Sequence, residues 1–132
     1  MTDWTAGELA AIDAVDELHI ASLRRDGSWS SSRIVWMVVV DGDLYVRSVR
    51  GPDAAWYRST QVRHQGRFEA GAVTRNVSYE RADSELDDRI DAAYRSKYGR
   101  YARSTVDSTT SRRARSTTLR LVPTMPSPAN NV

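Results

Sequence analysis

The residues best suited to chemistry concentrate in one short segment, residues 44–58, which reads LYVRSVRGPDAAWYR. A run typical of a β-strand carries Arg47 and Arg50 to a Gly-Pro break, and two large aromatic residues and a third arginine follow. Guanidinium groups bind phosphate or carboxylate through paired N–H donors, and aromatic rings pack against flat ligands. The segment therefore predicts the rim of an anion-binding pocket, with ordinary surface charge as the alternative.

Strand alternation separates the arginines of this segment. Side chains two residues apart share one face of a strand, so Arg47 points away from Ser48 and Arg50. Asp53 is the expected N-cap of a short helix, whose first N–H groups favour anions. If Arg47 holds an anion, its replacement by alanine should weaken ligand binding by about 1.5–3 kcal/mol and leave stability nearly unchanged. The alternative is a solvated arginine on an exposed edge.

The aromatic residues of the chain allow two interpretations. Trp56 and Tyr57 either flank a planar ring, with Arg58 adding charge, or pack the helix onto the rest of the fold. Lys97 is the only lysine among 19 basic residues and stands between tyrosines at helical spacing. It either belongs to a helix that packs its aromatic side chains or supplies a compact cation where a planar guanidinium does not fit.

Several classes of site are not supported. The chain has no cysteine, and its two histidines, His19 and His64, have no ligand pattern around them, so we expect no metal site. A net charge of +2 argues against a nucleic-acid partner, although the basic loop at residues 112–115 leaves that alternative open. There is no glycine-rich phosphate loop and no nucleophile motif.

Composition and length indicate a single globular unit. The chain has 132 residues, of which 40% are hydrophobic and 27% charged. We expect one domain at residues 1–123 and a disordered tail at residues 124–132. No apolar run reaches the roughly 20 residues of a membrane helix, and the N-terminus lacks a signal-peptide pattern, so a cytoplasmic location is expected.

The pattern of turns and apolar periods predicts a mixed fold dominated by strands. A capping box, Thr5 with Glu8, begins a helix, and Asp41-Gly42 marks a hairpin. The expected helices are residues 6–16, 53–62 and 86–98, and the expected strands are residues 17–27, 33–40, 43–49, 66–71, 72–82 and 116–123. Residues 104–116 read as a mobile loop or a frayed helix. The sequence thus predicts an α+β, mainly β, small antiparallel barrel of about six strands with two or three flanking helices.

Five blocks of the chain carry a resemblance to known proteins. Trp36, LYVRSVRG, WYR, AAYRSKYG and TTLRLVP, in this order and spacing, resemble a bacterial family, domain of unknown function 2255, over roughly residues 4–123. More distantly, the layout is similar to the flavin-binding split barrels, which include pyridoxamine-phosphate-oxidase-like and deazaflavin-dependent nitroreductase-like proteins. The second resemblance implies a split β-barrel that forms a homodimer, with each flavin at the dimer interface.

The resemblance also implies a site and a function. It places Arg47, Ser48, Arg50, Trp56 and Arg58 around the phosphate end of the cofactor, and Arg33 and Trp36 nearer its ring. Lys97 is a further candidate for cofactor binding, and Tyr57 and Tyr98 are candidates for proton donation. The implied function is redox chemistry on a small organic molecule with FMN or a deazaflavin coenzyme. The alternative is a cofactor-free binder or enzyme of isomerase or cyclase type, in secondary metabolism, on the same barrel.

Overall fold

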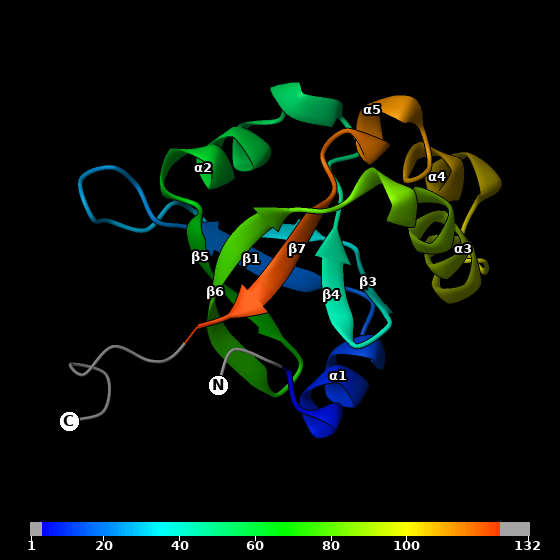
Figure 1. Cartoon of the computed structure of the whole chain (residues 1–132), viewed down its shortest axis with the longest axis horizontal. Helices are drawn as coiled ribbons and strands as arrows, with labels where there is room; N and C mark the ends of the chain where they lie inside the picture. Colours follow the sequence, from blue (N-terminus) through cyan, green and yellow to red (C-terminus); the bar gives the residue numbers. More distant parts are fainter. Residues whose placement is uncertain (1–3, 125–132) are drawn as a thin grey trace.

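A computed structural model describes residues 4–124 of the chain. Seven strands pair antiparallel in the order β2-β1-β5-β6-β7-β4-β3 (Figure 1). The strands are β1 (Leu18–Ser22), β2 (Arg33–Val35), β3 (Met37–Val40), β4 (Asp43–Val46), β5 (Gln65–Ala70), β6 (Val73–Arg81) and β7 (Leu119–Pro123). The helices are α1 (Ala6–Asp13), α2 (Ala55–Arg63), α3 (Asp87–Lys97), α4 (Arg103–Ser108) and α5 (Arg112–Arg115), with 3-10 turns at Gly51–Asp53 and Ser84–Leu86.

The barrel is nearly closed by one bent segment. β2 and β3 occupy the two ends of the strand order, yet only Trp36 separates them in the sequence. β2 pairs with β1 while β3 pairs with β4, so residues 33–40 provide both edge strands of the sheet. The sequence predicted one strand here, buried on both faces. The break at Trp36 raises the strand count from six to seven, and Arg33 and Ile34 are exposed.

The hairpin predicted at Asp41-Gly42 is confirmed, and the strands predicted at residues 66–71 and 72–82 also form a hairpin. Asp41 and Gly42 have φ values of 50° and 83°, the left-handed conformation that a type I′ turn requires at both positions. This turn fixes the register of β3 and β4, which pair from Met37 with Val46 to Val40 with Asp43. Gly71, with φ of 59°, lies in the turn between β5 and β6.

The predicted helix starts are confirmed in one case and wrong in another. Thr5 and Glu8 form the expected capping box of α1, although the helix ends at Asp13. Asp53 is not the N-cap of α2, because Pro52 places it in a 3-10 turn that precedes the helix. Ala54 occupies the N-cap position, and within residues 4–124 no side chain caps the helix there.

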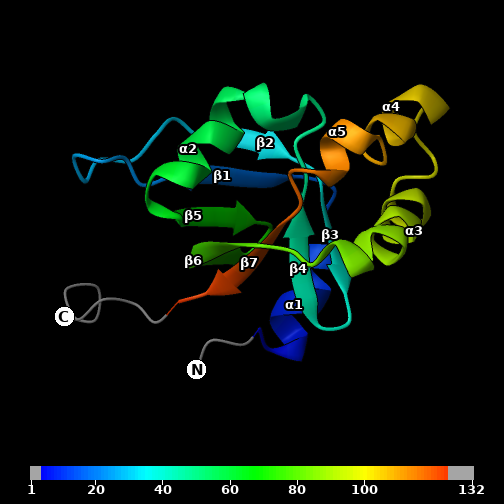
Figure 2. The ribbon, with the colours of Figure 1, turned by 45° about the horizontal axis from the view of Figure 1, so that its top comes forward.

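The segment expected to be a loop or frayed helix forms two short helices. Ser111 caps α5 by accepting a hydrogen bond from the backbone N–H of Ala114. Arg115 on the same helix binds the carboxylate of Asp91 on α3. Arg95 on α3 likewise donates a hydrogen bond to Asp107 on α4, so both short helices are tied to α3, and Figure 2 shows where their ribbons lie. Of the predicted tail, only Thr124 lies among the described residues.

Two apolar clusters stabilise this arrangement. One fills the barrel, where the indole N–H of Trp4 donates a hydrogen bond to the backbone oxygen of Leu121 at 2.9 Å. The other joins α3 to β3 and β4 and includes Ile90, Tyr94 and Tyr98. α2 contacts β1 and α3 contacts β3, so the two helices lie on different sides of the barrel. Within residues 4–124, no helix combines the length and apolar character needed to span a membrane.

Alkaline pH should weaken this core. Burial raises the pKa of Tyr79 to about 12, and burial also raises the pKa values of Tyr94 and Tyr98. Above the ordinary tyrosine pKa of about 10, the unfolded chain releases these protons while the folded chain retains them. The stabilisation is therefore complete below about pH 10 and is lost as pH rises toward about 12.

Urea unfolding at several pH values from about 9 to about 11 measures this loss. Tyr79→Phe should make the decline with pH less steep, because the variant lacks one of the protons that the folded chain retains. An identical decline in the variant and the parent would show that Tyr79 does not contribute.

Candidate functional site

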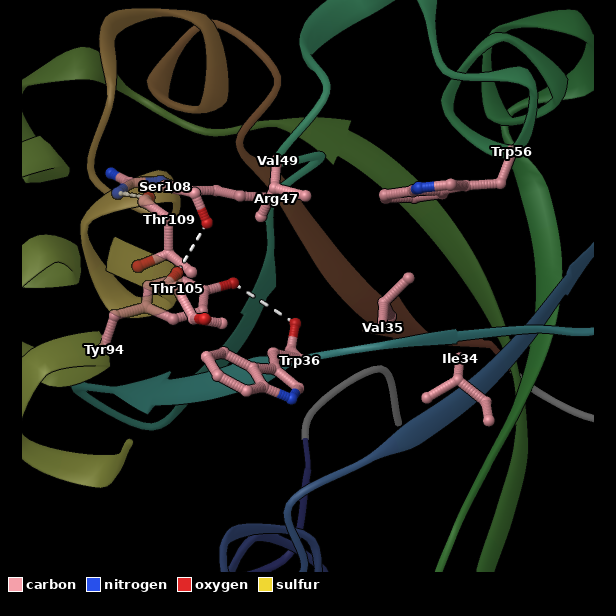
Figure 3. A pocket seen from close by; sticks show the side chains of 10 residues that line it. All are labelled: Ile34, Val35, Trp36, Arg47, Val49, Trp56, Tyr94, Thr105, Ser108 and Thr109. Carbon is pink, nitrogen blue, oxygen red and sulfur yellow. Dashed lines mark hydrogen bonds between the residues drawn. The ribbon is translucent and has the colours of Figure 1, made fainter. Parts of the chain in front are cut away.

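An apolar cavity of about 330 Å³ lies beside the bend at Trp36 (Figure 3). Its walls come from the β2–β3 segment, the end of β4, α2, α3 and α4. The lining residues are Ile34, Val35, Trp36, Arg47, Val49, Trp56, Tyr94, Thr105, Ser108 and Thr109. The predominance of aliphatic and aromatic side chains suits a ligand with a large flat apolar part.

Two indole rings form opposing parts of this cavity. In Figure 3, Trp56 lies toward the top of the hollow and Trp36 toward the bottom. The hydroxyl of Tyr94 donates a hydrogen bond to the backbone oxygen of Trp36 at 3.2 Å, which ties α3 to the bend. Trp56 contacts the edge of Tyr57, which is buried in the barrel core and does not line the cavity.

A second, polar cavity of about 210 Å³ lies on the other side of Trp56, which lines both. Its remaining lining residues are Ile20, Ser22, Arg24, Ser30, Ser31, Arg33, Ala55 and Ser59. Ala55 is the first residue of α2, so the start of this helix borders the cavity. Among residues 4–124, neither Arg24 nor Arg33 has a carboxylate within ion-pair distance. Cationic side chains, hydroxyls and helix N–H groups together suit an anion.

Arg47 meets an anion of the protein itself. Its Nη1 donates hydrogen bonds to Asp91 Oδ1 at 2.5 Å and to the backbone oxygen of Thr109 at 2.9 Å. Its Nε donates to Thr118 Oγ1 at 2.9 Å, and its Nη2 to the backbone oxygen of Asp87 at 3.4 Å. The side chain is fully buried. Every nitrogen of the guanidinium is thus engaged within the fold, and Arg47 forms part of the cavity wall.

Asp91 links three parts of this wall. Its Oδ1 binds Arg47 on the chain that follows β4, and its Oδ2 accepts a hydrogen bond from Arg115 Nε on α5 at 3.1 Å. Because Asp91 lies on α3, the ion pairs hold the α4–α5 segment beside the cavity. That segment contributes Thr105, Ser108 and Thr109 to the lining.

The remaining residues expected near the phosphate are dispersed. Ser48 is buried, and its hydroxyl donates to the backbone oxygen of Gly51 at 2.8 Å, which shapes the turn. Arg50 and Arg58 are exposed and line neither cavity. Of the candidates, the structure brings together Arg33, Trp36, Arg47 and Trp56.

Lys97 and Tyr98 lie behind the cavity rather than in it. The Lys97 ammonium lies 3.7 Å from the carboxylate of Asp13 and 5.4 Å from the ring centroid of Tyr98. Burial lowers the pKa of Lys97. The ring of Tyr98 stacks on Trp36 with a centroid distance of 4.0 Å. Tyr98 therefore supports Trp36 from the side away from the cavity, and Lys97 lies over the ring of Tyr98.

Sequence reasoning missed several lining residues. Tyr94 and Arg24 were not among the candidate site residues, and Arg24 belonged to the strand expected at residues 17–27. The hydroxyl residues of α4 lie in a serine- and threonine-rich stretch with no motif. Only their spatial position beside Trp36 and Arg47 identifies them.

Solved structures share this fold at low sequence identity. The heme storage protein HutZ from Vibrio cholerae superposes with a TM-score of 0.66 at 16% identity, over 92% of this chain and 91% of that one. A proposed 5-nitroimidazole antibiotic resistance protein from Bacteroides thetaiotaomicron gives 0.61 at 12% identity, over 93% and 81%. A heme binding protein from Mycobacterium smegmatis gives 0.58 at 15% identity, over 93% of this chain and 52% of that one. These likenesses show the split-barrel fold.

Sequence comparison gives the family. No protein of curated function matches the chain significantly. A family model described as an uncharacterized protein conserved in bacteria matches residues 8–121, which include the whole bent segment and both cavities. The chain therefore belongs to the DUF2255 family and has the split-barrel fold.

Proposed function

We propose that this chain binds a flavin or deazaflavin coenzyme across Trp56 and uses it for redox chemistry on a small organic molecule. One observation carries the proposal: a single indole, that of Trp56, lines both an apolar cavity and an arginine-containing polar cavity. A flavin nucleotide has the matching division into a flat ring system and a phosphate-bearing arm.

The donor set fits such a molecule. Arg24 and Arg33 can bind the phosphate through charge-assisted hydrogen bonds, and the start of α2 adds backbone N–H donors. Trp36 and Trp56 can pack against the ring, and Thr105 and Ser108 place hydroxyls at its edge. The bound coenzyme supplies hydride transfer, while these residues bind, orient and exclude water.

The heme-binding relatives suggest a different ligand, which the residues here suit less well. Heme iron is commonly held by histidine. His19 and His64 line neither of these two cavities. A phosphate-bearing flavin therefore accounts for the lining better than heme does.

We further propose that a second copy of the chain covers the apolar cavity. Ile34 and Val49 both line it, and their exposed fractions are 55% and 49%. Large apolar side chains at the rim of an open apolar hollow favour burial by a partner surface. A homodimer would shield the ring of a bound coenzyme from water.

Comparing FMN with riboflavin tests the division between the two cavities. Both ligands present the same ring, but only FMN carries the phosphate, so we expect tighter binding of FMN. The double variant Arg24→Ala/Arg33→Ala should bind FMN about 30-fold more weakly, equivalent to about 2 kcal/mol, and riboflavin almost unchanged. Fluorescence titration measures both affinities.

Arg58→Ala is the matched control, because Arg58 is exposed and lines neither cavity. An equal loss for FMN and riboflavin in the double variant would contradict an anion site at Arg24 and Arg33. If neither flavins nor deazaflavins bind, the coenzyme proposal fails. The cofactor-free alternative, a binder or isomerase-type enzyme that takes an anionic aromatic molecule into the same two cavities, would then be favoured.

A further inference from the structure

Four aromatic side chains form a continuous group between the apolar cavity and the protein surface. Trp36 and Tyr94 line the cavity. Tyr98 stacks on Trp36 with a centroid distance of 4.0 Å and an interplanar angle of 1°. Tyr101, whose exposed fraction is 39%, lies 5.0 Å from Trp36 by ring centroids. An electron can therefore pass from the surface to the cavity through rings in direct contact.

The hydrogen-bond partners of the three tyrosines differ in a way that matters for oxidation. A tyrosine that loses an electron also loses its phenolic proton, so it needs a base beside its hydroxyl. The hydroxyl of Tyr94 faces the backbone oxygen of Trp36, and that of Tyr98 lies between the backbone oxygens of Asp16 and Met37. Backbone carbonyl oxygens accept hydrogen bonds from these hydroxyls but do not take up the phenolic proton.

Among the described residues, only the hydroxyl of Tyr101, of these three tyrosines, has a carboxylate beside it. Its hydroxyl donates a hydrogen bond to the carboxylate of Asp16 at 2.6 Å. The same carboxylate binds Arg100, whose guanidinium also lies over the ring of Tyr101, 4.8 Å from its centroid. Packing of a half-exposed ring does not require this carboxylate. Its position indicates a role for the phenolic proton.

We propose that Trp36 and Tyr101 form a one-electron relay that carries oxidising equivalents from the cavity to the surface. Trp36 gives one electron to an oxidant in the cavity, such as the light-excited oxidised isoalloxazine of a flavin. Tyr101 returns one electron to Trp36 and passes its phenolic proton to Asp16. A hydrogen atom from a soluble thiol restores Tyr101, and Asp16 releases the proton to water. Tyr98 keeps its proton and serves as the stacked neighbour of Trp36.

With a flavin as the oxidant, the relay rests on the proposed function, but its geometry can be tested without any cofactor. Azide radicals produced by pulse radiolysis oxidise tryptophan in preference to tyrosine. In the unmodified protein, the indolyl absorption should decay while the phenoxyl absorption grows at the same first-order rate. That rate should not depend on protein concentration, because the transfer is internal. A failed flavin titration would therefore leave this test intact.

Two substitutions identify the members of the relay. Tyr101→Phe should lose most of the phenoxyl growth and lengthen the life of the indolyl radical, and Trp36→Phe should lose most of the growth as well. Tyr45→Phe, which changes a buried tyrosine on β4 outside this group, is the matched control and should behave like the parent. Full phenoxyl growth in either Tyr101→Phe or Trp36→Phe would overturn the proposal.

Asp16→Asn tests the proton acceptor. The amide oxygen can still accept a hydrogen bond but cannot take up the proton, so phenoxyl growth should be several-fold slower. Thermal unfolding of each variant establishes that it is folded at the temperature of the measurement. An unchanged rate in folded Asp16→Asn would show that the carboxylate is not the acceptor and would contradict the proposal.

Discussion

Asp91→Ala should lower the free energy of unfolding by about 3–5 kcal/mol, the usual cost of removing one partner from a buried ion pair. The Arg47 side chain is fully buried, and Asp91 is its close carboxylate partner at 2.5 Å. The substitution would leave a buried guanidinium with only the more distant carboxylate of Asp87, 3.5 Å away. It would also leave Arg115 with only the exposed carboxylate of Asp88 as a partner, which weakens the hold on α5. Urea unfolding followed by circular dichroism measures the change.

Glu80→Ala is the control for this prediction. Glu80 pairs with Arg120 where both side chains are about half exposed, and such surface pairs contribute about 0–1 kcal/mol. A loss in Asp91→Ala no larger than that in Glu80→Ala would contradict the structural role of the buried pair. The double variant Arg47→Met/Asp91→Leu should recover part of the loss, because apolar side chains remove the uncompensated charge.

This expectation reverses the one drawn from the sequence, in which Arg47 served ligand binding and not stability. Strand alternation correctly places Arg47 and Ser48 on opposite faces of the β4 segment. It does not show which of the two faces packs against a helix. The partner, Asp91, is 44 residues away in the sequence, on α3. No local pattern joins these two positions, since the contact depends on where α3 packs.

The features that sequence predicts well are those that depend on neighbouring residues. The capping box at Thr5 and Glu8 and the turn at Asp41-Gly42 each satisfy backbone requirements within a few residues. The antiparallel barrel follows because consecutive hairpins leave edges that must be covered. The break at Trp36 could not be predicted, because the residues on both sides of it are apolar and mostly β-branched, and only the closing of the barrel requires the bend.

The sequence predicted the kinds of side chain around the two cavities better than it predicted their positions in the chain. An arginine-rich, aromatic site was expected, and Arg33, Trp36 and Trp56 do lie around the two cavities. The arginines that line the polar cavity, Arg24 and Arg33, come from the chain after β1 and from β2, whereas the sequence pointed to the end of β4. Arg24 and Arg33 meet at one cavity only because β1 and β2 pair beside α2. That arrangement depends on tertiary structure and not on neighbouring residues.

Gly66→Ala should destabilise the fold by about 1–3 kcal/mol or more, because the position has no room for a side chain. A methyl group there would overlap the hydroxyl of Tyr79 and lie 2.8 Å from the backbone oxygen of Ala21. Gly66 on β5 pairs with Ser22 on β1, whose side chain lines the polar cavity. The added methyl group would push Tyr79 or β1 away, so the cavity should change shape together with the loss of stability.

Gly7→Ala provides the matched control for the Gly66 prediction. Gly7 is an exposed residue of α1, and its nearest neighbour to an added methyl group is Thr5 Oγ1 at 4.0 Å. The same chemical change should there stabilise the protein by about 0.5–1 kcal/mol through helix propensity. Urea midpoints that move in opposite directions for the two variants would confirm both predictions. A Gly66→Ala variant as stable as the parent would show that the barrel can widen at β1 and β5, and the close approach of Tyr79 would then not be required.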